Sequence, residues 1–316
     1  VKKSLDFRLS SFPFFLSLYK IMIMNNYPII KLRRGKDEAV RRYHPWIFSG
    51  AIETAAPNIQ AGDLVTVVDF KNEILGTGFA EAGNIAVKLL SFDNRKIDAS
   101  FWKERLEKAF ELRKMMGLVD NQHTNCYRLV HSEGDNLPGL IIDIYGTTAV
   151  VQAQTEGMAL NIKSISDSLL NIDGLDINSV YNKSSEAMQR MGKEAVDDGY
   201  LVGEKTDDFV CENDSKFLID WEKGQKTGFF LDQRNNRDLV RKLAKGKNVL
   251  NTFCYTGGFS VTALHGGANK VVSVDCSKKA ILASEQNLIL NGFSAEEKPC
   301  VAEDAKLFLQ NMKKGE

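Results

Sequence analysis

One region in the last third of the chain constrains the fold more than any other. It alternates short apolar segments with stretches of helical periodicity, and a pair of glycines follows the first apolar segment. Strands that alternate with helices predict a parallel, doubly wound sheet. The expected elements are a strand at 247–252, a helix at 259–264, a strand at 270–275, a helix at 278–291 and a strand at 298–301.

The turn after the first of these strands favours a nucleoside cofactor that carries a carboxylate. It reads Thr256-Gly257-Gly258-Phe259-Ser260, and the second strand ends on Asp275. Glycines let the backbone approach a ligand, a helix N-terminus offers free N–H groups to a carboxylate, and an acid after the next strand can bind a ribose diol. The turn lacks the G-x-G-x-x-G pattern of dinucleotide sites and the G-x-x-x-x-G-K-[ST] pattern of nucleoside triphosphate sites. S-adenosylmethionine therefore fits this turn best.

Charge is balanced over the whole chain but not locally. The 316 residues carry no net charge, whereas residues 31–42 contain six basic side chains against Asp37 and Glu38. Such a cluster indicates either a nucleic-acid-binding surface or an ordinary solvated face. The five cysteines are scattered and none has C-x-x-C spacing. They therefore favour no disulfide framework and no metal site, and they indicate a reducing, cytoplasmic location.

The two ends of the chain carry separate expectations. Residues 12–24 are apolar, but they are too short to span a bilayer and contain Pro13 and Lys20, so we predict no membrane association. We expect residues 1–25 to be an extension ahead of a natural start at Met22 or Met24. A doubly wound sheet would have about half of its strands by residue 316, so we expect the last domain to be truncated.

Two further domains are expected before the parallel sheet. Short strands separated by glycine and asparagine turns predict a small β-barrel. The next region mixes helices with strands, and a hairpin across Gly146-Thr147 lies at its centre. The barrel strands are expected at 64–69, 74–80 and 85–90, and the mixed region at helix 101–116, strands 140–145 and 148–154, helix 157–170, strand 180–181 and helix 185–191.

Three motifs together resemble the PUA-containing, S-adenosylmethionine-dependent methyltransferases of large-subunit ribosomal RNA. They are Gln225-Lys226-Thr227-Gly228-Phe229-Phe230-Leu231-Asp232-Gln233-Arg234 with Arg237, residues 249–259, and His44-Pro45-Trp46-Ile47-Phe48-Ser49-Gly50 after the basic residues 31–35. The resemblance implies a multidomain protein: a PUA-like RNA-binding barrel at 26–97, a central α+β domain at 98–208 and an incomplete Rossmann-like class I methyltransferase domain at 209–316. It also implies methylation of 23S ribosomal RNA to 5-methylcytosine, and it leaves a homodimer open.

The same resemblance assigns cofactor contacts to three segments. The loop before the α/β fold would cover the cofactor, the glycine turn would surround its methionine end, and two acids would bind its ribose and its adenine amino group. The residues assigned to S-adenosylmethionine are Lys226, Thr227, Gly228, Phe229, Phe253, Tyr255, Thr256, Gly257, Asp275 and Asp304. The alternatives are that the two acids cap helices and that the phenylalanines belong to the core.

No catalytic residue is assigned. Methylation at carbon 5 of cytosine needs a thiolate that adds to carbon 6. Cys254 belongs to the cofactor turn, where a small apolar residue serves packing, and Cys276 has no stronger claim. The Asp-Pro-Pro motif and the nucleophilic cysteine of the family have no match up to residue 316, so we expect them beyond it. His123 and His131 show no partner spacing that indicates a catalytic or metal role.

Aromatic and basic residues of the barrel are the candidate RNA contacts, because unpaired bases stack on rings and phosphates need cations. The alternative places at least one of Trp46 and Phe48 inside the barrel. A stripe at Arg234, Arg237 and Arg241 would contact phosphates or be solvated. A non-enzymatic RNA-binding protein with an incomplete cofactor fold is the alternative function. The residues assigned to ribosomal RNA are Lys31, Arg33, Arg34, Arg41, Arg42, His44 and Trp46.

Overall fold

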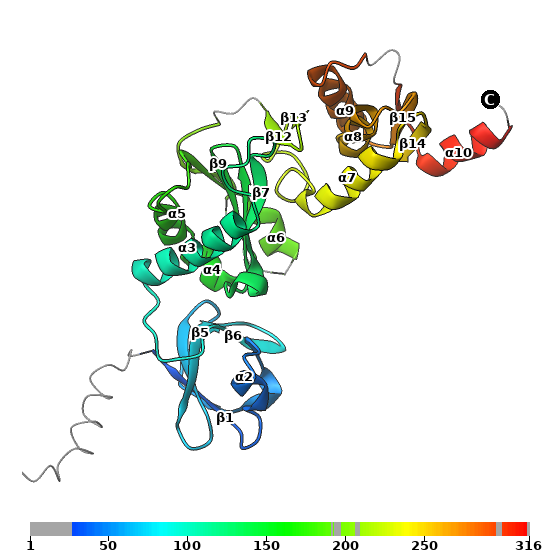
Figure 1. Cartoon of the computed structure of the whole chain (residues 1–316). Coiled ribbons are helices and arrows are strands. Elements are labelled where there is room, and N and C mark those ends of the chain that lie inside the picture. Colours follow the sequence, from blue (N-terminus) through cyan, green and yellow to red (C-terminus); the bar gives the residue numbers. More distant parts are fainter. Residues whose placement is uncertain (1–26, 191, 193–196, 206–208, 295–298, 315–316) are drawn as a thin grey trace, which may run out of the picture.

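The computed structural model describes residues 27–190, 192, 197–205, 209–294 and 299–314. Three domains follow one another along the chain, and the central domain lies between the N-terminal sheet and the C-terminal α/β domain (Figure 1). The extension expected at residues 1–25 lies outside the described residues. No helix in the described ranges is both long enough and apolar enough to cross a membrane.

The N-terminal domain is a curled six-stranded sheet with the order β2-β6-β5-β4-β1-β3 (Figure 1). β1 and β4 are parallel, and the other neighbours are antiparallel. Alternate side chains such as Val65, Val67 and Val87 are fully buried and form its core. Its elements are β1 (Ile29–Leu32), α2 (Glu38–Arg41), β2 (Trp46–Phe48), η1 (Ser49–Ala51), β3 (Ile52–Ala55), β4 (Leu64–Val68), β5 (Ile74–Ala80) and β6 (Ile85–Ser91).

The central domain is a five-stranded sheet with the order β11-β10-β9-β8-β7. The predicted hairpin is confirmed as β8 and β9, which pair in register from Leu140–Ala153 to Tyr145–Thr148. The elements are α3 (Ala99–Met115), β7 (Cys126–His131), η2 (Ser132–Asp135), β8 (Leu140–Tyr145), β9 (Thr148–Ala153), α4 (Glu156–Leu160), α5 (Ile162–Leu169), β10 (Ser179–Asn182), α6 (Ser185–Arg190) and β11 (Gly199–Val202).

Both faces of the central sheet are covered, so every residue of β8 is buried. Ile142 and Ile144 face one core, which α3 and α5 complete. Tyr145 faces the other core and stacks on Trp221, with the ring centroids 5.9 Å apart. Residues 210–231 therefore join the central sheet to the C-terminal domain.

The C-terminal domain has three parallel strands in the order β14-β15-β16, as the alternating pattern predicts. The hairpin β12–β13 is attached to it, because the backbone N–H of Leu218 donates to Asn287 of α9. The elements are β12 (Val210–Glu212), β13 (Ser215–Phe217), η3 (Leu231–Gln233), α7 (Arg234–Leu243), β14 (Asn248–Thr252), α8 (Gly258–His265), β15 (Lys270–Asp275), α9 (Lys278–Leu290), β16 (Cys300–Ala302) and α10 (Ala305–Lys314).

One expected helix was wrong in extent. The single helix predicted at 157–170 is two helices, α4 and α5, which meet at Asn161. The side-chain amide of Asn161 donates to the carbonyl of Gly157 at 2.8 Å, and Gly157 itself lies so close to Phe79 that a Cβ would overlap the ring. Packing of this segment against the N-terminal domain therefore overrides its helical periodicity.

Candidate functional site

The turn after β14 is held in an uncommon backbone conformation. Phe253, Tyr255 and Gly257 have φ values of 58°, 48° and 78°, which non-glycine residues seldom adopt. Asp275, at the end of β15, stabilises this turn through its carboxylate, which accepts the backbone N–H of Tyr255 at 3.0 Å and that of Ser277 at 2.9 Å. The two carboxyl ends of neighbouring parallel strands therefore form one unit, as is typical of ligand sites in such sheets.

Gly257 is required by packing as well as by its backbone angle. A Cβ at this position would lie 2.2 Å from the Oγ atom of Ser284, which is buried on α9. Asn287 of the same helix donates its amide to the Thr256 carbonyl at 2.8 Å. The close approach of α9 therefore fixes the turn at the N-terminus of α8, where free backbone N–H groups favour an anion.

The loop of residues 224–228 lies on the ring of Tyr255. The Tyr255 hydroxyl accepts the backbone N–H of Gln225 at 3.1 Å and donates to the carbonyl of Gly228 at 3.3 Å. Phe230 makes an edge contact with the same ring, with centroids 5.5 Å apart. The structure thus brings the expected covering loop, through Gly228, against the expected cofactor turn. Phe253, the residue after β14, is 77% exposed, and its assignment to the cofactor stays a prediction.

Thr227 of this loop and Phe229, just after it, point into the junction between the central and C-terminal domains. Thr227 is buried, and its hydroxyl donates to Asp143 of β8 at 2.6 Å. Asp143 also pairs with Arg128 at 2.8 Å. Phe229 is buried in the core that also contains Tyr145 and Trp221, and the Arg237 guanidinium lies 4.4 Å from its ring centroid. These contacts give Thr227 and Phe229 a structural role, and their assignment to the cofactor stays a prediction.

The remaining acid of the expected site begins the last helix. The Asp304 carboxylate accepts the backbone N–H groups of Lys306 and Leu307, each at 3.0 Å, so this residue caps α10. It lies two residues after the end of β16 and therefore at the same edge of the sheet as Asp275. Its contact with an adenine amino group stays a prediction.

The pKa of the Cys254 thiol agrees with the interpretation that this residue serves packing. Burial, and secondarily the charge of Asp275, raise the pKa of the Cys254 thiol to about 12. Burial raises the pKa of Cys126 to about 12 as well. A thiol with such a pKa is protonated near neutral pH and is a poor nucleophile. In the described ranges no three His, Cys, Asp or Glu residues are grouped in a way that could hold a metal ion.

A cavity of about 630 Å³ lies between the central sheet and the loop before α7. Sequence reasoning missed this cavity, because its lining comes from strands and loops far apart in the chain. The sequence did contain one indication of it: Gln152 and Gln154 are two positions apart in an expected strand, so their side chains lie on the same face. Residues that line it include Arg128, Gln152, Gln154, Ala187, Lys226 and Phe230.

Four of the five basic residues assigned to RNA fall into two groups. Lys31, Arg33 and Arg34 line an open hollow of about 450 Å³ together with Phe70. Arg41 instead lies in an ion-pair cluster, 2.5 Å from Asp37 and 2.8 Å from the buried Asp69. Hydrogen bonding to Asp37 is the main cause that raises the pKa of Arg41.

The aromatic residues of β2 do not enter the core of the N-terminal domain. Ile47 is buried there, whereas Phe48 is 51% exposed. Trp46 is half-buried, and its indole N–H donates to Glu133 of the central domain at 2.9 Å. His44 makes an edge contact with the Trp46 ring. The alternative that Trp46 or Phe48 fills the core was therefore wrong, because the pleat of β2 points Ile47 inward.

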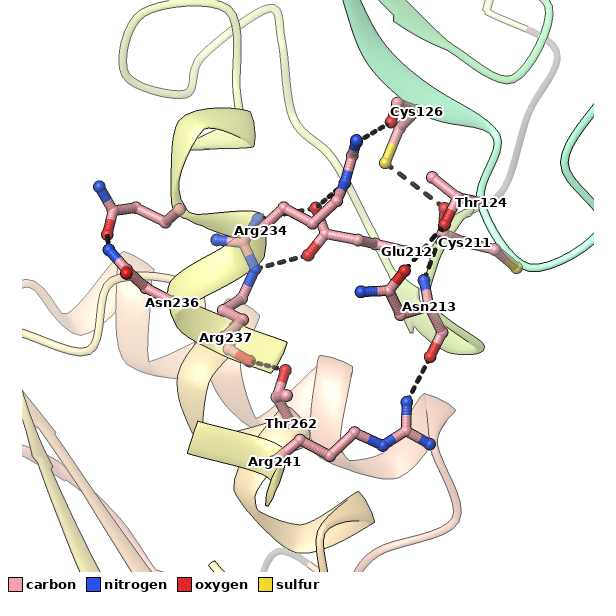
Figure 2. A network of polar contacts seen from close by, with 12 residues as sticks. Thr124, Cys126, Cys211, Glu212, Asn213, Arg234, Asn236, Arg237, Arg241 and Thr262 are labelled. Carbon is pink, nitrogen blue, oxygen red and sulfur yellow. Dashed lines mark hydrogen bonds and ion pairs between the residues drawn. The ribbon is translucent and has the colours of Figure 1, made fainter. Parts of the chain in front are cut away.

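The arginine stripe of α7 makes polar contacts within the protein, and its middle residue, Arg237, is buried. Arg237 and Glu212 are both buried and pair at 2.6 Å, and Arg234 pairs with Glu212 at 3.2 Å (Figure 2). Arg234 also donates to the Cys126 carbonyl of β7, and Arg241 donates to the Asn213 carbonyl at 2.6 Å. Both sequence interpretations were wrong for Arg237, which is buried, whereas Arg234 and Arg241 are partly exposed and a phosphate contact by them stays a prediction. The network anchors α7 to the central domain.

Comparisons with known proteins agree with this architecture. Residues 30–92 match the model of a PUA-like domain, and residues 185–305 match that of an S-adenosylmethionine-dependent methyltransferase. The chain is 37% identical to Ribosomal RNA large subunit methyltransferase I of Aeromonas hydrophila over 91% of its own length and 73% of that protein. It is 33% identical to the protein of the same name from Klebsiella pneumoniae, over 92% of its own length and 73% of that protein.

A solved structure shares the fold across most of the chain. It is a candidate S-adenosylmethionine-dependent methyltransferase from Streptococcus mutans, with a TM-score of 0.76 and 22% identity. The likeness covers 91% of this chain and 73% of that one. A second solved structure, of a candidate methyltransferase in complex with SAH, has the same TM-score of 0.76 and covers 91% of this chain and 72% of its own.

Proposed function

Because the chain belongs to the ribosomal RNA large subunit methyltransferase I family, and is thus an S-adenosylmethionine-dependent methyltransferase, we propose that it methylates large-subunit ribosomal RNA. The main support for this proposal is the edge of the sheet at which the parallel strands β14, β15 and β16 end. There the glycine turn, Asp275 and Asp304 follow three neighbouring strands in the order that a nucleoside cofactor with a carboxylate requires.

Each part of the cofactor has a complementary group at this edge. The N-terminus of α8 would receive the methionine carboxylate, Asp275 the ribose hydroxyls and Asp304 the adenine amino group. Gly228 would cover the cofactor from the loop that rests on Tyr255, whereas Lys226 of the same loop lies over the ring of Phe230. Bound there, the cofactor supplies an electrophilic methyl group, and the chain's own residues orient it and exclude water.

The N-terminal domain would hold the RNA. Lys31, Arg33 and Arg34 provide cations around an open hollow, and the exposed Phe48 and the half-buried Trp46 provide rings. An exposed cation neutralises phosphates, and rings stack on unpaired bases. We propose 5-methylcytosine in 23S ribosomal RNA as the product, on the family resemblance. Cys254 does not supply the required thiolate, since its pKa is raised to about 12.

Deleting the gene in its source organism tests the proposed function without any assumption about the catalytic residue. Nucleosides from purified 23S RNA are separated and identified by mass spectrometry. The expected result is a lower amount of 5-methylcytosine per 23S RNA molecule, with restoration by the gene supplied on a plasmid. Loss of a different methylated nucleoside would revise the product, and an unchanged RNA would contradict the proposed function.

A further inference from the structure

We propose that the central-domain cavity of about 630 Å³ binds an unpaired nucleotide of the RNA substrate. This inference rests on the proposed function and adds a second RNA site to the N-terminal surface. The volume lies within the range of about 300–1,000 Å³ that is usual for small-ligand pockets, so one nucleotide can enter. The cavity is formed by β7, β8, β9 and α6 on one side and by the loop before α7 on the other.

Two amides give the cavity the means to recognise a base. Gln152 and Gln154 project from the same face at the end of β9, and their side chains are 3.4 Å apart. The Gln152 amide is fixed because it donates to the Lys183 carbonyl at 3.1 Å. An amide carries both donors and an acceptor, which are the groups that read the Watson–Crick edge of an unstacked base.

The opposite wall offers a cation and an aromatic ring. The Nζ atom of Lys226 lies 4.7 Å from the centroid of Phe230, and both residues line the cavity. The Lys226 side chain is exposed, so its charge is available to a phosphate. Phe230 is only partly buried, and a base can stack on the exposed part of its ring.

The cavity also lies between the two surfaces that the proposed function uses. Its wall at Phe230 contacts Tyr255 of the cofactor turn. Its rim at Glu133 accepts the indole N–H of Trp46 from the N-terminal domain. An RNA strand held on the N-terminal domain is therefore directed past Trp46 toward the cavity, and a nucleotide in the cavity lies next to the cofactor turn. Figure 1 shows α6, which carries Ala187, on the opposite side of the central sheet from α5.

A cavity-filling substitution tests the proposal without removing any polar group. Ala187 lines the cavity, and Gln189 on the same helix is exposed outside it. Ala187→Trp therefore places an indole in the cavity, and Gln189→Trp places the same side chain in solvent as the matched control. Binding of a short fluorescent single-stranded RNA to the full 316-residue chain is measured by anisotropy. Binding of S-adenosylmethionine is measured separately by calorimetry.

We expect Ala187→Trp to weaken RNA binding by about tenfold, as for the loss of one stacked base, and Gln189→Trp to leave it unchanged. Both variants should bind S-adenosylmethionine like the parent. Gln154→Ala is a second variant that adds no bulk, and it should also weaken RNA binding. With 4-thiouridine in the RNA, ultraviolet crosslinks should map to β9 and α6 in the parent and disappear in Ala187→Trp.

Two results would overturn separate conclusions. If Ala187→Trp and Gln154→Ala both bind RNA like the parent, the cavity does not hold a nucleotide and the proposed function stands. If the parent binds S-adenosylmethionine but no RNA, the proposed function itself is contradicted. Crosslinks confined to residues 31–48 in the parent would also exclude the cavity.

Discussion

Asp275 combines two tasks in one carboxylate. It accepts two backbone N–H groups, from Tyr255 and Ser277, and it lies where the ribose of the proposed cofactor would be. Replacement by alanine removes the ribose acceptor and also loosens the turn. We expect Asp275→Ala to abolish S-adenosylmethionine binding in calorimetry and to leave RNA affinity intact.

Asp275→Asn removes part of each role. The two backbone N–H groups donate to different carboxylate oxygens, and asparagine keeps only one oxygen, so one of these hydrogen bonds is lost together with the charge and one acceptor for the diol. This variant should therefore bind the cofactor more weakly than the parent and unfold at a lower temperature. Equal cofactor affinity in the parent and in Asp275→Ala would contradict the assignment of Asp275 to the ribose.

Gly257 and Gly258 form a matched pair of neighbouring glycines. Gly257 has φ of 78°, and a Cβ would lie 2.2 Å from Ser284, whereas Gly258 has ordinary helical geometry and its nearest atom would lie at 3.4 Å. We expect Gly257→Ala to lower the free energy of unfolding by about 2 kcal/mol, and Gly258→Ala to keep it or raise it by up to about 1 kcal/mol.

Urea denaturation of both variants measures this difference. Because Ser284 is buried on α9, its Oγ atom has little room to move away from a new methyl group. Equal stability of Gly257→Ala and the parent would show that α9 can shift, and the turn would then not depend on this glycine. The same samples give the cofactor affinity, which should fall for Gly257→Ala because the turn is displaced.

At the scale of elements, periodicity predicted most helices and strands, because each depends on a local pattern of buried side chains. The strands β14 and β15, the hairpin β8–β9 and the helices α3 and α9 are found within a few residues of their expected bounds. The strands at Cys126–His131 and Gly199–Val202 were missed, although Tyr127, Leu129 and Val130 are residues that favour strands.

The partners of polar side chains could not be predicted from local patterns. Thr227 donates to Asp143, which is 84 positions away in the chain, and Arg237 pairs with Glu212 of a hairpin that had not been predicted. A motif shows that a residue type occurs at a position, but burial decides whether it meets a ligand or the protein interior. The glycine turn itself was predictable because its glycines and the strand before it form one local pattern, and its contact with the cofactor stays a prediction.

The α7 arginine network should dominate the stability of the domain junction. Glu212 and Arg237 are 2% and 3% exposed at their side chains, so loss of the carboxylate would leave buried, unpaired guanidinium groups. Breaking a buried pair from one side costs several kcal/mol, and we expect Glu212→Ala to lower the free energy of unfolding by roughly 3 kcal/mol. Urea denaturation provides the measurement.

Lys242→Ala on the same helix is the control for this prediction. Lys242 pairs with Asp238 at 2.6 Å, but its side chain is 70% exposed. Exposed pairs contribute little, so this variant should change the free energy of unfolding by less than about 0.5 kcal/mol. Similar effects of Glu212→Ala and Lys242→Ala would mean that the network does not hold the junction together.

At the scale of the whole molecule, the three domains are linked by polar contacts as well as by packed cores. Trp46 and Glu133 connect the N-terminal and central domains, and Thr227 and Asp143 connect the central domain to the loop before the α/β fold. Trp46 and Thr227 both belong to the motifs by which the chain resembles its family. Those motifs therefore position the domains relative to one another in addition to any contact that they make with RNA or cofactor.

The surface that holds RNA can be identified by the salt dependence of binding. Each phosphate neutralised by a cation adds about 0.7 to the slope of log affinity against log salt for a single strand. Arg34 is exposed beside Phe70 and is free to contact phosphates, whereas the charge of Arg41 is compensated by Asp37 and Asp69. Arg34→Gln should reduce the slope by about 0.7, and Arg41→Gln should leave it unchanged.

Anisotropy titrations with single-stranded RNA across a range of salt concentrations, checked by thermal unfolding of each variant, give both slopes. Equal slopes for the parent and Arg34→Gln would exclude the hollow at Lys31, Arg33 and Arg34 as the RNA surface, and a reduced slope for Arg41→Gln would show that RNA displaces the ion-pair cluster.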